Sequence, residues 1–294
     1  MRTYLDCYPC FIRQSLEAAR LVTDEPLVQQ EILRRTMQLI SKSELTQTPP
    51  AMGQQIHRII RQITKNPDPY EAVKAKSNKF AASLIPHLKK QLSSSPRPFE
   101  TAVRLAIAGN IIDFGAKSGY TEDQVHDSIA EALSAPMDEQ LFVELSEAIA
   151  ASQSILYIAD NAGEVFFDRL LIEMMPWEKT TYAVRGAPTI NDATVDDAKV
   201  AAIDEMVEII DNGSDAPGTV LEDCSDAFRK RFEQADLIIA KGQGNYETLS
   251  DIRKNIFFML KVKCPVVAGH IGYPVGSTIL LKHSFDKCLE TDSV

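Results

Sequence analysis

The sequence has no apolar run that approaches the roughly 20 residues needed by a membrane-spanning helix. Its first segment, MRTYLDCYPC, contains no apolar core of the length that a secretory signal peptide requires. Positive charge is also scarce, because 31 Lys and Arg stand against 41 Asp and Glu and the net charge is −10. A nucleic-acid surface needs basic residues in excess. We therefore expect neither a membrane nor a nucleic-acid partner, and a cytoplasmic location.

Cysteine is rare, and histidine is absent from the segments that carry the strongest functional pattern. Five cysteines, an odd number in 294 residues, do not describe a disulfide framework. Cys7 and Cys10 have the spacing of half a zinc site or of a redox pair, and a thiol at a helix start can have a lowered pKa. A second CxxC is missing. Three roles for these cysteines stay open, namely structural thiols, a partial metal site and a redox pair. We expect that neither cysteine takes part in catalysis.

Glycine is concentrated in the second half of the chain, and this asymmetry predicts the architecture. Only four of the 13 glycines precede residue 150, and this half shows the three- and four-residue apolar spacing of helices. Helices are expected over 11–23, 27–41, 54–64, 69–91, 99–114 and 121–133. Strands are expected at 154–159, 180–184, 206–210, 236–240, 257–262 and 278–282. We predict a doubly wound α/β fold with a mostly parallel sheet at 151–294, and a helical subdomain at 1–150 that folds with it as one unit.

The most informative segment is 154–164, SILYIADNAGE. A buried strand runs into Asp160 and Asn161, and a turn with Gly163 then leads into a helix. Ligands bind beyond the carboxyl ends of the strands in open α/β sheets. A carboxylate and an amide oxygen there suit a hard divalent cation such as Mg²⁺ or Mn²⁺. The alternative is that Asp160 only caps the following helix.

Two later strand ends carry polar residues in the same way. The run 180–184 leads into RGAPTIND, and 236–240 leads into KGQGNYE, each ahead of a helix. Since a parallel sheet brings such loops to one edge, Asp160, Asn161 and Asp192 would supply a metal with oxygen ligands. Arg185 and Lys241 would meet an anionic substrate, which glycines let backbone N–H groups approach. The candidate substrate-binding residues of these loops are Arg185, Asn191, Gly242, Gly244 and Asn245.

Further candidates lie close to these motifs in the sequence. Glu164, four residues after Asp160, is either a catalytic base, a group that supports the metal ligands, or an acid that favours a helix N-terminus. Glu247 has the same alternatives. The segment GNIIDFG contains Asn110 and Asp113, which either satisfy backbone groups at a helix end or reach over the site to bind substrate. Together with Asp160 and Glu164, Lys241 is a candidate catalytic residue.

These segments resemble the motifs of a known family. DNAGE after a strand, INDAT, KGQGNYE and the upstream GNIIDFG are similar to those of the metal-dependent damage-control phosphatases, long known only as a domain of unknown function. The resemblance covers nearly the whole chain, and CYPC resembles the short prokaryotic branch. It implies a metal held by Asp160, Asn161 and Asp192 and hydrolysis of phosphometabolites, often sugar phosphates or damaged cofactor precursors. The R-T-x-K stretch of the eukaryotic sugar-phosphate branch is missing, so the substrate stays open.

The leading interpretation is thus a divalent-metal-dependent phosphatase acting on a small phosphorylated metabolite. Mg²⁺ or Mn²⁺ is the expected cofactor, with Ni²⁺ or Co²⁺ as alternatives. Either an activated water or Asp160 itself would attack the phosphorus. The alternative function is a nucleotide- or S-adenosylmethionine-binding transferase on a Rossmann-like core, although the first turn has no G-x-G-x-x-G. A non-enzymatic metal-binding protein that uses Cys7 and Cys10 is a third hypothesis.

Overall fold

A six-stranded sheet forms the centre of the structure, a computed structural model that describes residues 1–111 and 122–283. The strand order is β3-β2-β1-β4-β5-β6. The first five strands pair in parallel and β6 pairs antiparallel to β5, which confirms the predicted α/β fold. The order reverses between β1 and β4, and this is where doubly wound sheets open a crevice for ligands. The strands are β1 (Ile155–Ile158), β2 (Thr180–Val184), β3 (Glu208–Asp211), β4 (Leu237–Lys241), β5 (Ile256–Lys261) and β6 (Thr278–Lys282).

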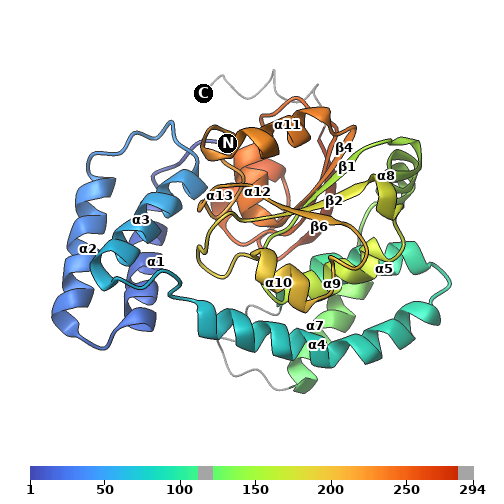
Figure 1. Cartoon of the computed structure of the whole chain (residues 1–294), viewed down its shortest axis with the longest axis horizontal. Helices are drawn as coiled ribbons and strands as arrows, with labels where there is room; N and C mark the ends of the chain where they lie inside the picture. The colour runs from blue at the N-terminus through green and yellow to red at the C-terminus, as the bar shows by residue number, and fades with distance from the viewer. Residues whose placement is uncertain (112–121, 284–294) are drawn as a thin grey trace.

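Helices cover both faces of the sheet (Figure 1). Because side chains alternate along a strand, Ile155 and Tyr157 of β1 enter one core and Leu156 and Ile158 enter the other. The first core also takes side chains from α4 (Glu71–Ser93), α5 (Pro98–Ala108), α7 (Glu122–Ser134), α8 (Glu139–Ala151), α9 (Glu164–Ile172) and α10 (Val195–Val200). The second takes them from α11 (Asp226–Gln234), α12 (Gly242–Leu249) and α13 (Pro265–Ile271). Because helices bury both faces of the sheet, the central strands consist of continuous apolar residues, as the sequence indicated.

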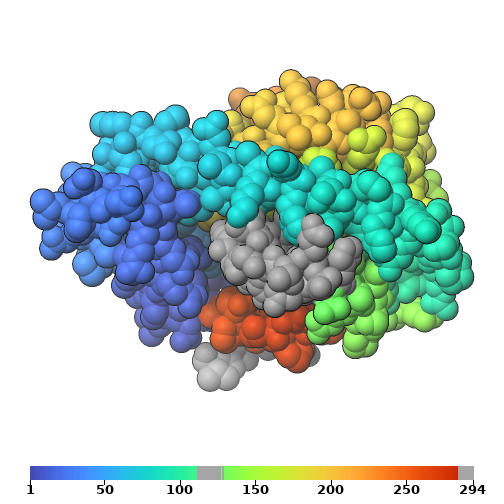
Figure 2. Space-filling view, turned by 90° about the horizontal axis from the view of Figure 1, so that it is seen from below, coloured from blue at the N-terminus to red at the C-terminus, as the bar shows by residue number. Residues whose placement is uncertain are grey.

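The first three helices form a lobe beside the sheet, with a third apolar core of their own (Figure 1). They are α1 (Cys7–Val22), α2 (Pro26–Ile40) and α3 (Pro49–Thr64). Proline begins α2 and α3, where its missing N–H has no helical partner to lose, and the Thr48 side chain accepts a hydrogen bond from Ala51 N. Figure 2 shows this lobe at one end of the molecule, with α4 leading away from it along the α/β part.

The cores do not divide at residue 150. Helices α4, α5, α7 and α8 pack on the sheet rather than with the α1–α3 lobe. The first core therefore crosses the expected boundary between 1–150 and 151–294, and that division stays a prediction. None of the helices in the described ranges is both long and apolar enough to cross a membrane.

Several element boundaries differ from the sequence expectation. The helix expected over 99–114 ends as α5 at Ala108 and continues as the short 3-10 helix Gly109–Ile111. Helix α8 was not expected, and β3 begins two residues later than predicted. Short charged strands and surface helices show only a weak periodicity of apolar residues. Their boundaries are therefore set by tertiary contacts that the sequence pattern does not reveal. Asp113 lies outside the described residues.

A polar cluster ties the α1–α3 lobe to the loop that follows β3. Asp215 in this loop accepts hydrogen bonds from Gln54 and Arg58 of α3, and it forms a further ion pair with Arg61. Arg61 also donates to the carbonyl oxygen of Pro188 in the loop after β2, at 3.0 Å. Helix α3 therefore fixes two of the loops that emerge from the carboxyl edge of the sheet.

We expect Asp215→Asn to lower the free energy of unfolding at pH 7 by about 1–3 kcal/mol, because Arg61 loses its ion pair with Asp215 and Arg58 keeps only its ion pair with Asp223. Burial acts to raise the pKa of Asp215, but hydrogen bonds from Arg58 and Gln54 outweigh it and the pKa lies below its ordinary value. Such a carboxylate stabilises the fold above its unfolded-state pKa, and the contribution disappears as the pH falls through the folded-state pKa.

Urea unfolding of the wild type and the variant from about pH 7 down to about pH 3 measures this difference, which should shrink at the acid end. The exposed Asp204, changed to Asn, is the control. A difference that grows as the pH falls would contradict the assigned ion pairs.

Candidate active site

The loops after β1 and β2 are joined directly at the edge of the sheet. Asn161 and Asp192 form an isolated antiparallel bridge. The main chain of Ala193 donates to the carbonyl oxygen of Asp160 at 2.8 Å, and that of Ala162 donates to the carbonyl oxygen of Asn191 at the same distance. The structure thus brings together the three predicted metal ligands, Asp160, Asn161 and Asp192, from neighbouring strands, all of them buried.

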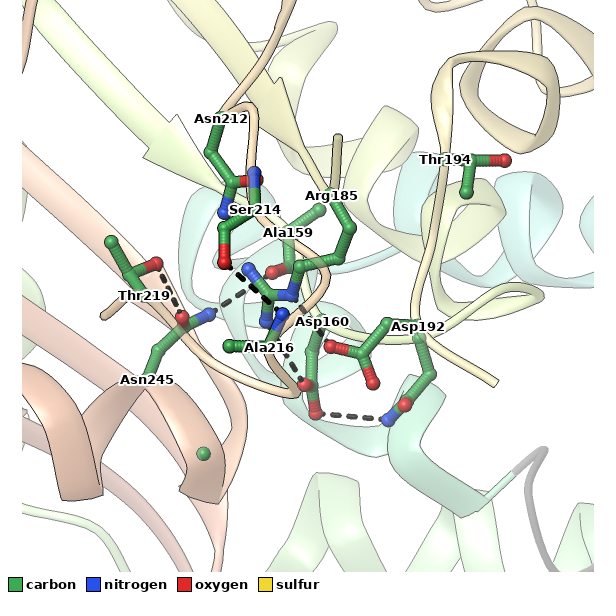
Figure 3. Close-up of polar contacts among 12 residues, drawn as sticks. Ala159, Asp160, Arg185, Asp192, Thr194, Asn212, Ser214, Ala216, Thr219 and Asn245 are labelled. Carbon is green, nitrogen blue, oxygen red and sulfur yellow. Dashed lines mark hydrogen bonds and ion pairs between the residues drawn. The ribbon is translucent and has the colours of Figure 1, made fainter. Parts of the chain in front are cut away.

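Arg185, directly after β2, lies beside both acids (Figure 3). Its Nε donates to Asp192 Oδ2 at 2.6 Å, and its Nη2 is 3.9 Å from Asp160 Oδ1. The side chain is 1% exposed, yet Nη1 and Nη2 have no hydrogen-bond partner among the described residues. An unsatisfied buried donor costs about 1–3 kcal/mol. This pair of terminal nitrogens is therefore suited to an anion, as the sequence predicted for Arg185.

The two acids of this site are held in unfavourable surroundings for negative charge. Burial raises the pKa of Asp160 well above its ordinary value, and Glu164 and Asp192 raise it further. Burial likewise raises the pKa of Asp192, although Arg185 opposes the shift. Low-dielectric surroundings and like charges both disfavour the ionised form, and a bound cation would remove this penalty.

Glu164 links the metal-ligand candidates to the helical part of the chain. Its Oε1 accepts from Asn161 Nδ2 at 2.9 Å and from Asn110 Nδ2 at 2.7 Å, and its Oε2 accepts from Lys241 Nζ at 3.1 Å. Asn161 Nδ2 also donates to Asp160 Oδ2 at 2.9 Å. Since both Glu164 oxygens are occupied by protein donors, the geometry favours a supporting role over that of a general base.

Lys241 meets protein carboxylates rather than an open site. Its ammonium lies 2.6 Å from Asp168 Oδ1 and 3.1 Å from Glu164 Oε2, and all three side chains are at most 1% exposed. Burial acts to lower the pKa of Lys241, but the two acids outweigh it and raise that pKa. A substrate contact was expected for Lys241 because a cation at this edge would lack an anionic partner. The structure shows that this premise is wrong, since Lys241 pairs with Glu164 and Asp168.

Asp168 accepts two further hydrogen bonds. The hydroxyls of Tyr157 and Tyr182 donate to its two oxygens at 2.7 and 2.8 Å. The two rings stack at 5.4 Å between centroids. Asp168 is thus the anchor of a polar network inside the sheet core, directly below the loops of the site.

The loop after β4 is shaped by close approaches within the protein. Gly242 has φ +81°, and a side chain there would collide with the carboxylate of Asp160. A side chain at Gly244 would collide with the carbonyl oxygen of Pro217. Asn245 donates to the carbonyl oxygens of Ala159 and Lys241 at 3.0 and 2.7 Å.

The side-chain oxygen of Asn245 also has a partner, since it accepts from Thr219 Oγ1 at 2.8 Å (Figure 3). The side chain therefore uses its donors and its acceptor to join three segments of the protein. Gly242, Gly244 and Asn245 shape the site by these contacts, and their binding of substrate, like that of Asn191, stays a prediction.

Three residues of this region were not found from the sequence. Asp168 lies within the helix EVFFDRLLI and was not singled out. A single acid in an apolar run nevertheless indicates a buried carboxylate that needs a polar partner. Lys263 follows β5, its main-chain N–H donates to Gln243 Oε1 at 2.9 Å, and its charge acts to lower the pKa of Asp160 and Asp192. Asn212 follows β3. The rule of polar strand ends would have identified the last two if it had been applied to every strand.

Cys7 and Cys10 lie in the first turn of α1, and Asp113 is not described. The Cys7 thiol is buried, and burial raises its pKa, so the expected effect of a helix start on thiol acidity is wrong for this residue. Cys7, Cys10, Cys224 and Cys264 are all free thiols. The separation of the pair from the chemistry stays a prediction.

The charge and donor types of the site fit a divalent cation. Among the described residues, four buried carboxyl groups, Asp160, Glu164, Asp168 and Asp192, are in ion-pair contact with two cations, Arg185 and Lys241, so that carboxyl groups outnumber cations. Within the described ranges, no three His, Cys, Asp or Glu side chains form a metal centre by themselves. The predicted set therefore depends on the amide oxygen of Asn161 as its third ligand, a hard donor that suits Mg²⁺ or Mn²⁺.

Comparison with known proteins identifies the class. The family described as "Damage-control phosphatase ARMT1-like domain" matches residues 3–279. An uncharacterized protein of Methanocaldococcus jannaschii is 41% identical over 94% of both chains, and a damage-control phosphatase of Archaeoglobus fulgidus is 36% identical over 93% of this chain and 96% of its own. A DUF89 family protein of Pyrococcus horikoshii has a crystal structure with a TM-score of 0.89 and 32% identity, covering 97% of this chain and all of its own.

The chain belongs to the damage-control phosphatase family, as its motifs indicated. Membership supports a phosphatase that acts on a metabolite.

Replacing Lys241 tests the buried network. We expect Lys241→Met to cost about 3–5 kcal/mol of stability, because Asp168 and Glu164 would be left buried without their cation. Combining it with Asp168→Asn should cost less than the sum of the single changes, and urea unfolding of the four proteins of this cycle measures the coupling. The exposed Lys230, changed to Met, is the matched control. Equal effects of the two lysine changes would refute the network.

The two acids of the site should respond with opposite signs. In EDTA, Asp160→Asn should raise the free energy of unfolding by about 1–2 kcal/mol, because it removes a buried charge that repels Glu164 and Asp192. Asp192→Asn should lower it by a similar amount, because Arg185 loses its ion pair. Thermal and urea unfolding provide the measurement, and shifts of the same sign would contradict the assigned geometry.

Proposed function

We propose that this protein is a divalent-metal-dependent phosphohydrolase that acts on a small phosphorylated metabolite, of the sugar phosphate or damaged cofactor precursor type. The observation that carries the proposal is the contact between Arg185 and the two acids. A buried guanidinium, whose two terminal nitrogens have no hydrogen-bond partner among the described residues, lies beside the carboxylates of Asp160 and Asp192. A site in which carboxyl groups outnumber cations favours a further cation, and the terminal nitrogens of Arg185 favour an anion as acceptor, so a metal and a phosphoryl group together would satisfy both requirements.

The residues of the chain would divide the work as follows. Asp160, Asn161 and Asp192 would hold the cation, which when bound would withdraw charge from the phosphoryl oxygens. Arg185 would bind the phosphoryl group through Nη1 and Nη2, while its Nε remains on Asp192. It would therefore keep the phosphoryl group at a set position relative to both acids, which is how positioning lowers a barrier to phosphoryl transfer.

The other charged residues would support this arrangement. Glu164 would keep the amide of Asn161 oriented, because its Oε1 accepts from Asn161 Nδ2. Lys241 would neutralise Glu164 and Asp168 from below. Lys263, an exposed cation whose charge acts on both acids, would attract the substrate anion and partly balance Asp160 and Asp192.

Phosphate release tests the proposal. With Mg²⁺ or Mn²⁺ the protein should release inorganic phosphate from a panel of phosphomonoesters, and EDTA should abolish the activity. Arg185→Lys keeps a positive charge beside Asp192 but removes the planar pair of terminal nitrogens, so we expect KM to rise by about tenfold or more. Lys230→Met is the control.

Two outcomes would contradict the proposal. One is phosphate release that is the same with EDTA as with added metal. The other is tight, metal-independent binding of S-adenosylmethionine without any phosphate release, which would favour the transferase. The comparisons favour the phosphatase over that alternative.

A further inference from the structure

Most unsatisfied polar atoms of the described residues belong to the loop that carries Arg185 and to the neighbouring loop after β3. Within residues 1–111 and 122–283, the buried side-chain atoms without a hydrogen-bond partner are Asn110 Oδ1, Arg185 Nη1, Arg185 Nη2, Thr189 Oγ1 and Asn212 Nδ2. Four of these five atoms belong to the loops that follow β2 and β3, which are neighbouring strands. Phosphate binding by Arg185 accounts for its two nitrogens, and the neutral groups of Thr189 and Asn212 require another explanation.

Asn212 is held against the main chain on both sides of Arg185. Its N–H donates to the carbonyl oxygen of Val184 at 2.9 Å, and its Oδ1 accepts from the N–H of Gly186 at the same distance. The Oδ1 also accepts from Ser214 N at 2.9 Å. These contacts use the oxygen of the amide and orient it, while the Nδ2 group, in a side chain that is 1% exposed, has no partner.

Thr189 lies in the same loop as Arg185 and is also held by the main chain. Its carbonyl oxygen accepts from Asp192 N at 3.0 Å, and its neighbour Pro188 accepts from Arg61 of the helical lobe. The side chain is 2% exposed, and its hydroxyl has no partner. Both neutral groups are therefore positioned by backbone contacts in the loops on which Arg185 is mounted.

We propose that Thr189 Oγ1 and Asn212 Nδ2 form a subsite that binds hydroxyl or carbonyl oxygens of the organic part of the substrate. The inference rests on the proposed function, because Arg185 takes the phosphoryl group. An amide N–H₂ and a hydroxyl are neutral and directional, so they match oxygen atoms of a neutral group better than a second charged group. The subsite makes these two residues determinants of specificity for polyoxygenated phosphomonoesters over phosphates with apolar substituents.

Binding measured without turnover tests the subsite. Calorimetric titrations in EDTA, which prevents turnover, would compare ribose 5-phosphate and glycerol 3-phosphate with methyl phosphate, which lacks hydroxyl groups. The wild type should bind at least one of the first two about tenfold more tightly than methyl phosphate. Thr189→Val, which removes the hydroxyl and keeps the shape, should reduce this preference about fivefold or more, and Thr189→Ser should retain it.

Two further variants separate the subsite from general effects. Asn212→Asp keeps the acceptor for Gly186 and Ser214 but removes the amide donor, and the ratio of the two Kd values cancels the effect of the added charge on phosphate. This ratio should fall as it does for Thr189→Val. Thr64→Val is the matched control, because the Thr64 hydroxyl donates to the carbonyl oxygen of Ile60 within α3.

The outcomes are distinct. A wild type without preference for the hydroxylated ligands would overturn the subsite, as would a Thr189→Val variant that weakens methyl phosphate and ribose 5-phosphate equally. Loss of phosphate hydrolysis in every metal, with the binding preference and its Thr189 dependence intact, would overturn the proposed function and leave the subsite standing.

Discussion

The ammonium of Lys241, held between Asp168 and Glu164, is the interaction on which the geometry of the site depends. Lys241 ends β4, and both acids lie on α9, so the contact holds this helix against the carboxyl edge of the sheet. Asp168 extends the contact to β1 and β2 through two tyrosine hydroxyls. Glu164 extends it upward to the side chain of Asn161. A single buried cation therefore connects three strands, one helix and the candidate metal ligands.

This arrangement places opposite electrostatic demands on folding and on function. A buried carboxylate is stable only with donors or cations around it, and those below the site have them. Burial raises the pKa of Asp160, Asp168 and Asp192 alike, but Asp160 has no cation in hydrogen-bond contact among the described residues, and Glu164 and Asp192 raise its pKa further. Arg185 is the complementary case, because its Nε donates to Asp192 while Nη1 and Nη2 have no hydrogen-bond partner among the described residues. On our proposal, a cation and an anion would meet these two requirements.

The sequence predicted the α/β class and the meeting of Asp160, Asn161 and Asp192, because both follow from local patterns and one topological rule. Continuous apolar runs signal strands buried on both faces, and parallel strands bring their carboxyl ends to one edge. The partner of Lys241 could not be predicted in this way. Whether a cation at a strand end points toward the crevice or toward the neighbouring helix is decided by tertiary packing, and only the lone acid in α9 hinted at it.

The same limit applies to Gly244 and Asn245, whose contact with substrate stays a prediction. A glycine next to a charged residue suggests room for a ligand, but close approach to another loop requires glycine equally. In this fold the room is taken by Pro217, and the Asn245 amide is taken by Ala159, Lys241 and Thr219. Short-range sequence patterns identify residues that require an interaction partner, but they do not identify that partner.

The α1–α3 lobe holds the loops after β2 and β3 in place. The loops after β2 and β3 carry Arg185 and, on our proposal, the specificity groups, yet they have little regular structure of their own. Helix α3 holds their conformation by hydrogen bonds. Gln54 and Arg58 donate to Asp215, and Arg61 donates to the carbonyl oxygen of Pro188. The sheet thus places Asp160 and Asn161 directly after β1, whereas the helical lobe holds the loop that carries Asp192 and, on our proposal, the specificity group of Thr189. Contacts of α3 therefore bear on a candidate metal ligand and on the proposed subsite together, because one loop carries both.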